Sequence, residues 1–152
     1  MQRKDHVKPP LHSSAISRHS GREMPEVHQR NTRQRSSIKR VFEQTDRPLS
    51  PHEVLSLAQR ELKGLGIATV YRNIRSLLEQ GSLTSVHLPG GSVLYEVAGK
   101  EHHHHFQCDR CHRVFELDGC VPAITKLAKP KFQVLRHDLT LYGLCADCRT
   151  VG

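Results

Sequence analysis

The chain has 152 residues, a formal net charge of +8 and 36% hydrophobic residues, with no tryptophan. This length holds one ordinary domain or two small ones, and small domains often need a metal ion or a partner to complete their cores. No apolar run approaches the roughly 20 residues of a membrane-spanning helix, and no apolar signal segment follows the basic start, so we expect a cytoplasmic protein without a membrane partner. The basic balance is compatible with a polyanionic partner such as nucleic acid.

The first 29 residues form a separate segment by composition. They are polar and basic, with scattered histidine, serine and proline, and they show no sustained apolar periodicity. A segment of this kind cannot bury enough apolar surface to offset the entropy of ordering it. We therefore predict a disordered basic tail over residues 1–29.

Three short helices are predicted after this tail. The first, over residues 32–44, has Thr32 as a permissible N-cap and apolar residues at helical spacing. The second opens with Ser50-Pro51-His52-Glu53, a capping box with proline at the first helical position. The third, over residues 67–80, carries an apolar stripe and is followed by Gly81 as the C′ residue. Three helices in this order predict a helix-turn-helix motif.

A hairpin signal follows the third helix directly. Residues 83–88 and 92–97 lean apolar and are joined by Pro89-Gly90-Gly91. A hairpin in this place is the wing of a winged helix-turn-helix. We therefore predict a DNA-binding domain over residues 30–98.

The third helix has a polar face opposite its apolar stripe. That face carries Thr69, Tyr71, Arg72, Asn73, Arg75 and Ser76. Such side chains can meet phosphates and base edges when the helix lies in a major groove. A merely solvated face is the alternative, but basic residues on or near the first helix favour DNA. These basic residues are Arg30, Arg33, Arg35, Lys39 and Arg40.

The remainder, residues 99–152, has few core residues. Short β-like runs are expected at Phe106 and at residues 114–117, 132–135 and 139–142, with one short helix at about 122–129. So small an apolar set suggests a metal-stapled α/β unit completed by dimerisation. The predicted fold class is therefore α+β, a winged helix-turn-helix domain followed by a small C-terminal α/β dimerisation domain.

Two Cys-x-x-Cys pairs lie far apart in the second half of the chain. They are Cys108 with Cys111, and Cys145 with Cys148. A reduced pair of this spacing places both sulfurs on one side, and two pairs supply a closed tetrahedron for zinc. Disulfides fit less well because no signal peptide is seen and Cys120 is left over. A thioredoxin-like dithiol would need only one pair. We predict a structural zinc site.

Four consecutive histidines, residues 102–105, precede the first cysteine pair. A purification remnant or a solvated turn would also give such a run. This one is internal and flanked by apolar Val97 and Phe106. Because imidazole is a common metal ligand, we expect at least two of these histidines to bind metal.

Five short segments, taken in their order along the chain, resemble those of a known protein family. They are Thr32-Arg33-Gln34-Arg35, Ala68-Thr69-Val70-Tyr71-Arg72, Tyr95-Glu96, residues 102–111 and Tyr142-Gly143-Leu144-Cys145. In this order, over about residues 32–149, the chain resembles the ferric-uptake-regulator family of metal-sensing bacterial repressors. The resemblance implies a winged-helix DNA-binding domain, a C-terminal dimerisation domain, a homodimer, and repression when a regulatory metal is bound.

The resemblance also implies roles for individual residues. It assigns Tyr71 and Arg72 to the major groove and Arg30 to the minor groove, and the two cysteine pairs to structural zinc. The regulatory metal would lie at the junction of the two domains. Its implied shell consists of Glu96, His103, His105 and Glu116. One ion held by the end of the wing and the start of the next domain would fix their relative orientation, and so DNA affinity.

Two departures from the family pattern accompany this assignment. A further family histidine falls on Pro48, where His52 or water would have to replace it. A second site in part of the family maps to His102, His104 and His137, with an acidic residue that falls near Cys120 or Ala123. Cys120 is either that ligand or a free buried thiol.

The expected function is a metal-dependent repressor that binds operator DNA as a homodimer when iron or zinc occupies the regulatory site. Mixed imidazole and carboxylate ligands also suit manganese, so the effector stays open. The alternatives are a peroxide-sensing repressor of the same family and a zinc-ribbon interaction module without sequence-specific DNA binding. Neither His-Glu-x-x-His nor a deaminase signature occurs, so we expect no enzyme and no small-molecule substrate.

Overall fold

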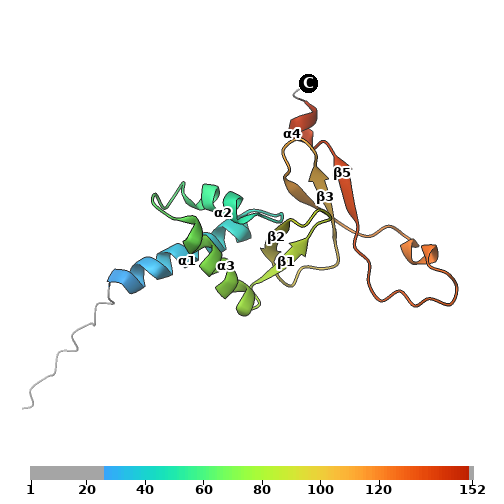
Figure 1. Ribbon diagram of the computed structural model, residues 1–152, viewed down its shortest axis with the longest axis horizontal. Helices are drawn as coiled ribbons and strands as arrows, with labels where there is room; N and C mark the ends of the chain where they lie inside the picture. The colour runs from blue at the N-terminus through green and yellow to red at the C-terminus, as the bar shows by residue number, and fades with distance from the viewer. Residues whose placement is uncertain (1–25, 151–152) are drawn as a thin grey trace, which may run out of the picture.

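The computed structural model describes residues 26–150, with side chains described from residue 29. In Figure 1 the helices lie on the left and a hairpin lies in the middle. A small sheet, from which a long loop extends, lies on the right. Residues 1–25 of the predicted tail lie outside the described residues. Residues 26–29 belong to the first helix, so the predicted tail boundary is wrong at this end. None of the described helices combines the length and apolar character needed to cross a membrane.

The helical part consists of the three predicted helices. They are α1 (Glu26–Gln44), α2 (Pro51–Ala58) and α3 (Ile67–Glu79). The Ser50 hydroxyl accepts a hydrogen bond from the Glu53 backbone N–H, and the Glu53 carboxylate accepts from the Ser50 backbone N–H, which confirms the predicted capping box. After α3, Gly81 adopts a φ of +66°, the left-handed conformation that a helix C′ residue requires.

The core of this part is built from all three helices. Ile38 and Phe42 of α1, Val54 of α2 and Ile74 of α3 are buried together. The wing strands β1 (Leu83–His87) and β2 (Val93–Val97) pair antiparallel in the predicted hairpin. Leu49 forms an isolated bridge with Tyr95, which ties the wing to the loop before α2. The wing is therefore held against the helical part, where Leu83, Tyr95 and Val97 also pack on the core.

The C-terminal sheet has the strand order β4-β3-β5. Its strands are β3 (His104–Cys108), β4 (Val114–Leu117) and β5 (Thr140–Gly143), and α4 (Ala146–Arg149) follows. β3 pairs antiparallel with β4 and parallel with β5. A parallel pair needs a crossover connection, and the excursion over residues 118–139 supplies it.

The crossover differs from the sequence prediction. The expected helix over residues 122–129 is only a 3-10 turn, η1 (Ile124–Leu127), and the expected strand over residues 132–135 does not form. A strand needs a neighbour for its backbone hydrogen bonds, and within the described chain this segment runs out from the sheet without one. Phe132 and Leu135 are largely exposed as a result.

The wing and the C-terminal sheet pack against each other directly. Val114 of β4 is buried with Val86, Leu88 and Leu94 from the hairpin. Glu96 is buried on the same face of β2 as Leu94. A carboxylate on this face points toward the C-terminal part and away from solvent, so the junction contains a buried acidic group.

Candidate metal centres and nucleic-acid surface

Three groups of metal-ligating side chains lie in the described part of the chain. Within each group, one ligand atom per residue lies within 4.8 Å of all the others. The groups are Cys108, Cys111, Cys145 and Cys148; Glu96, His103 and His105; and His102, His104, Cys120 and His137.

The four-cysteine group lies at one end of the C-terminal sheet. Cys108 ends β3 and Cys111 lies in the turn after it, while Cys145 immediately precedes α4 and Cys148 lies within it. Sγ of Cys111 is 3.8 Å from Sγ of Cys145. Sulfurs at about 2.3 Å from a tetrahedral ion are separated by about 1.6 bond lengths, or about 3.8 Å, whereas a disulfide needs about 2.05 Å. The residues therefore fit a closed zinc site.

The surroundings of the four sulfurs favour the thiolate form at Cys108 and Cys111 but not at Cys148. Backbone N–H groups of Cys111 and Cys145 donate to Sγ of Cys108 and lower its pKa to about 6. The guanidinium of Arg113 donates to Sγ of Cys111 at 3.3 Å and lowers the pKa of that thiol. Burial raises the pKa of Cys148 to about 12. Without a cation the group cannot hold four thiolates, because like charges at this distance repel.

The second group joins the wing to the C-terminal sheet. Nε2 of His103 lies 3.3 Å from the Glu96 carboxylate, and Nε2 of His105 lies 3.7 Å from it. Glu96 is 4% exposed. Nε2 of His105 is buried without a hydrogen-bond partner. One carboxylate and two imidazoles that converge from two parts of the fold can hold a divalent cation with mixed N and O ligands.

The electrostatics of this junction group are set by its burial and its neighbours. Burial raises the pKa of Glu96, but contacts with His105 and His103 outweigh it, so the net pKa lies below the ordinary value. For His103, burial lowers the pKa, but a hydrogen bond to the Glu101 carbonyl and the charge of Glu96 reverse this and raise it. A positive charge beside Glu96 is therefore favourable in this pocket, as it would be from a cation.

Glu116, the fourth predicted regulatory ligand, lies outside this group. It pairs with His105 across the β3–β4 ladder, but its carboxylate accepts a hydrogen bond from Lys100. Lys100 also donates to Asp46 at 3.1 Å, from the loop after α1. Lys100 therefore bridges the two parts of the chain. This role could not be predicted from the sequence, because a single lysine between two motifs carries no pattern.

The loop position of the family histidine offers no ligand. Pro48 is fully buried. His52 is exposed on α2 and belongs to none of the three groups. The described residues therefore supply three ligands to the junction group.

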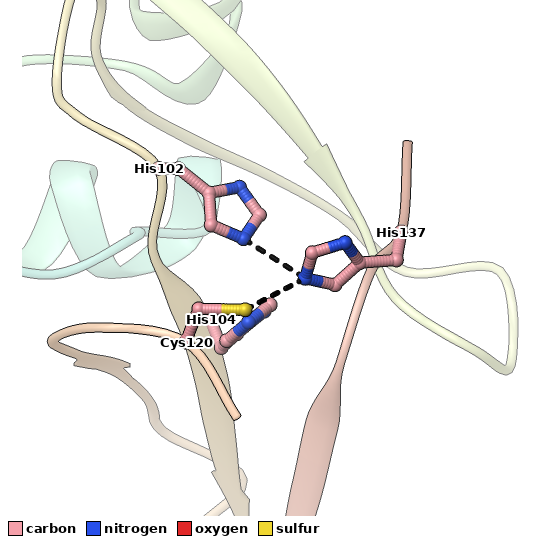
Figure 2. A group of neighbouring side chains, drawn as sticks. All are labelled: His102, His104, Cys120 and His137. Atoms are coloured by element: carbon pink, nitrogen blue, oxygen red, sulfur yellow. Dashed lines mark hydrogen bonds between the residues drawn. The ribbon is translucent and has the colours of Figure 1, made fainter. Parts of the chain in front are cut away.

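The third group surrounds the point where the crossover leaves and rejoins the sheet. Figure 2 shows His102 and His104 beside β3, Cys120 on the loop after β4, and His137 on the segment that leads into β5. Nε2 of His137 lies 3.1 Å from Nε2 of His102 and 3.0 Å from Sγ of Cys120. The group thus unites the predicted second-site histidines with the remaining cysteine. Cys120 is exposed, so the predicted alternative of a buried free thiol is wrong.

The predicted DNA-reading face of α3 is accessible. Tyr71, Arg72 and Arg75 are exposed, and Thr69 is half-buried. Nη2 of Arg72 donates to the Thr69 hydroxyl at 3.2 Å, and Arg75 pairs with Glu79 at 3.1 Å on the exposed surface. Surface pairs of this kind are weak and exchange readily for phosphate or base contacts.

The basic residues of α1 divide into two sets. Arg30 and Arg33 are exposed and line a surface hollow with residues 62–65. Arg35 donates to the side chain of Gln80 beyond the end of α3, and Lys39 pairs with Glu43. The first set presents its charge to solvent, while the second also bonds within the chain.

The chain is similar to known proteins over most of its length. Residues 26–142 match the model of the Ferric uptake regulator family. A ferric uptake regulation protein of Campylobacter jejuni is 32% identical over 125 residues, which are 77% of this chain and 78% of that protein. A zinc uptake regulation protein of Mycobacterium tuberculosis is 32% identical over 124 residues, covering 80% of this chain and 95% of that protein.

A solved structure is similar over nearly the same extent. The ferric uptake regulator from Francisella tularensis with iron superposes with a TM-score of 0.60 and 31% identity, covering 76% of this chain and 91% of that chain. The relatives named for iron and for zinc have the same identity to this chain, so identity does not select the effector metal.

Proposed function

The chain belongs to the ferric uptake regulator family, and from that premise we propose that it is a metal-dependent repressor that binds operator DNA as a homodimer. The family consists of metal-responsive transcription regulators and not of enzymes. The observation that carries the proposal is the convergence of Glu96 from the wing with His103 and His105 from the C-terminal part.

Regulation would act through the orientation of these two parts. Glu96 ends the hairpin that follows the DNA-reading helix, and the histidines begin the sheet. A bound divalent ion, iron or zinc with manganese as a further candidate, supplies positive charge shared by both parts. A shell that closes only in one arrangement shifts the population toward that arrangement, by as much as its affinity differs between the two.

The proposed homodimer follows from the C-terminal sheet. Its β4 and β5 are both edge strands within the described chain. Leu141 and Tyr142 of β5 and Leu144 after it are exposed large hydrophobics on or beside one of those edges. A second copy that covers such an edge would hide both its unpaired backbone groups and its apolar side chains. Two recognition helices could then reach successive major grooves about 34–36 Å apart.

The DNA contacts proposed are those that the exposed face of α3 offers. Tyr71, Arg72 and Arg75 would meet base edges or phosphates, with Thr69 at the edge of this face. Arg30 is exposed on α1 and could reach the adjacent minor groove, whereas Arg35 would have to give up its contact with Gln80. These assignments rest on exposure, charge and the family pattern.

A titration of DNA with the zinc-loaded full chain tests the proposal. Two kinds of DNA are compared: fragments from upstream of the gene that encodes this chain, and random fragments. Each is titrated with no added metal and with Fe(II), Zn(II) or Mn(II). We expect tight operator binding only with one of the ions, and weaker, salt-sensitive binding to random DNA. Binding that ignores both metal and sequence would instead identify a basic zinc-ribbon interaction module.

The peroxide-sensing alternative uses the same junction group and has its own test. The Fe(II)-loaded protein on operator DNA is exposed to peroxide, with the Zn(II)- or Mn(II)-loaded protein as control. Irreversible release only in the iron form would identify a peroxide sensor. Unchanged binding would leave the metal-dependent repressor.

A further inference from the structure

The four consecutive histidines, at the start of β3 and just before it, separate into two groups that face opposite ways. Successive residues of a strand point to opposite faces, so the even-numbered and odd-numbered residues of the histidine run separate. His103 and His105 face Glu96. His102 and His104 face the other way, toward Cys120 and His137. The second group shares no ligand with the junction group, so it can be occupied independently.

His104 shows that this second group is built to hold a ligand. It is 3% exposed, and both ring nitrogens are buried without a hydrogen-bond partner. A buried imidazole of this kind has lost its hydrogen bonds to water and has no protein partner in exchange, which costs free energy of folding. Its ring lies 4.6 Å from that of His102 and 5.1 Å from that of His137, centroid to centroid. A cation among these rings would satisfy it.

The positions of the other ligand atoms agree with a tetrahedral ion. Nε2 of His137 lies 3.1 Å from Nε2 of His102 and 3.0 Å from Sγ of Cys120. Nitrogen and sulfur ligands at about 2.0–2.3 Å from a tetrahedral ion are about 3.3–3.8 Å apart, so small side-chain rotations suffice. In a neutral ring, Nε2 of His137 has either one proton or one lone pair, so it cannot make both of these contacts as full hydrogen bonds at once.

The family resemblance already places a second metal site at His102, His104 and His137, with an acidic fourth ligand. We propose that in this chain the thiolate of Cys120 takes the place of that acidic residue, and that it makes the group a tetrahedral zinc site. The thiolate decides the class of ion. Carboxylate and water ligands suit manganese and magnesium, whereas a thiolate with three imidazoles selects zinc and, as its spectroscopic substitute, cobalt(II). This goes beyond the proposed sensing at Glu96, because the two sites differ in ligand chemistry and in the segments they join.

The segments joined by this site give it a structural consequence. Cys120 begins the crossover and His137 ends it, while His102 and His104 belong to β3 and its approach. An ion held by all four side chains ties both ends of the crossover to the central strand. The crossover carries Leu127, which is 86% exposed, and Phe132. Zinc at this site would therefore restrict the segment that presents these apolar side chains.

Cobalt(II) spectroscopy on the full chain tests the proposal. The protein is prepared with zinc in the four-cysteine site, kept reduced and free of oxygen, and titrated with cobalt(II). A thiolate-to-cobalt charge-transfer band in the near ultraviolet reports sulfur ligation, and intense visible bands report tetrahedral geometry. The junction group contains no sulfur, so cobalt bound at Glu96 does not contribute the thiolate band.

The variants separate the outcomes. Cys120→Ser should abolish the thiolate band and weaken this site at least tenfold, since even outer-shell partners are worth roughly 10–100-fold in metal affinity. Cys120→Asp should keep an ion without the thiolate band, and His137→Ala should lose both. His52→Ala, an exposed histidine outside the three groups, should behave as the parent. Released zinc is measured in parallel, so any cobalt entering the four-cysteine site is counted.

A parent protein that shows no thiolate band beyond that released zinc would overturn the proposal. So would a Cys120→Ser protein that keeps the full band. The measurement contains no DNA, so its failure is distinct from failure of the proposed repressor. The repressor proposal fails if metal leaves operator binding unchanged, whatever the cobalt spectrum shows.

Discussion

The Glu96 carboxylate, at the end of the wing, lies 3.3 Å from Nε2 of His103, just before the first strand of the C-terminal sheet. The two residues come from parts of the chain that also meet through an apolar contact, where Val114 packs on the wing. The junction is therefore partly fixed by packing and partly by charge. Only the charged part can respond to an ion, because apolar packing has no differential affinity for it.

Loss of one junction imidazole should uncouple sensing from folding. In His105→Ala, metal-activated operator binding should fall by roughly 5–150-fold, the range of typical coupling energies of about 1–3 kcal/mol. The zinc content of the four-cysteine site and the melting temperature should be unchanged, because His105 belongs neither to that site nor to the apolar cores. Fluorescence anisotropy with and without metal measures this. His52→Ala is the matched control. Full activation in His105→Ala would move sensing to His102, His104 and His137.

Lys100 should compete with the metal for Glu116. In Lys100→Met, Glu116 loses its cation and is free to join His105, its neighbour across the ladder, so affinity at the junction site should rise. In Glu116→Gln that affinity should fall. Isothermal titration of the zinc-loaded protein with Mn(II) measures both. If neither variant changes the affinity, Glu116 is not a ligand and the junction shell is limited to Glu96, His103 and His105.

The four-cysteine site should be structural. Structural zinc contributes roughly 10–16 kcal/mol of apparent binding free energy in zinc-finger peptides, more than the total stability of many small domains. Cys108→Ser should therefore lose this zinc, unfold the C-terminal sheet and abolish dimerisation, while mild chelation of the parent leaves the zinc bound. Metal analysis, circular dichroism and sedimentation measure these effects. Cys120→Ser is the control and should stay folded and dimeric. A dimeric Cys108→Ser protein with unchanged melting would contradict the assignment.

Arg72 should contact bases and so contribute to sequence specificity, while Lys39 on α1 should contact phosphates regardless of sequence. Arg72→Ala should weaken operator binding by about 1–3 kcal/mol if the guanidinium bonds a base bidentately, with a smaller effect on random DNA. Lys39→Ala should weaken both DNAs alike and reduce the salt slope by about 1 if Lys39 neutralises one phosphate. Salt-dependent binding curves on both fragments measure the difference. Equal losses for Arg72→Ala on operator and random DNA would make it a backbone contact.

Much of the helical part could be predicted because its signals are local. The capping box at Ser50 and Glu53, the apolar stripe of α3 and the turn at Gly81 each depend on residues within one or two helical turns. The two Cys-x-x-Cys pairs are local in the same sense, and their chemistry limits what they can bind. These features determined the winged helix and the zinc site from the sequence alone.

Features that depend on distant neighbours were decided only by the tertiary structure. The apolar run at residues 132–135 has strand-like composition, yet no partner strand lies beside it within the described chain, so it forms no regular structure and stays exposed. Lys100 reaches Glu116 and Asp46, and Cys120 reaches His137, across intervals that no spacing rule covers. The strand alternation of β3 could be counted from the sequence. The side chains that lie opposite each face of β3 depend on the path of the crossover and on the packing of the wing. These long-range contacts are set by the whole fold and not by neighbouring residues in the sequence.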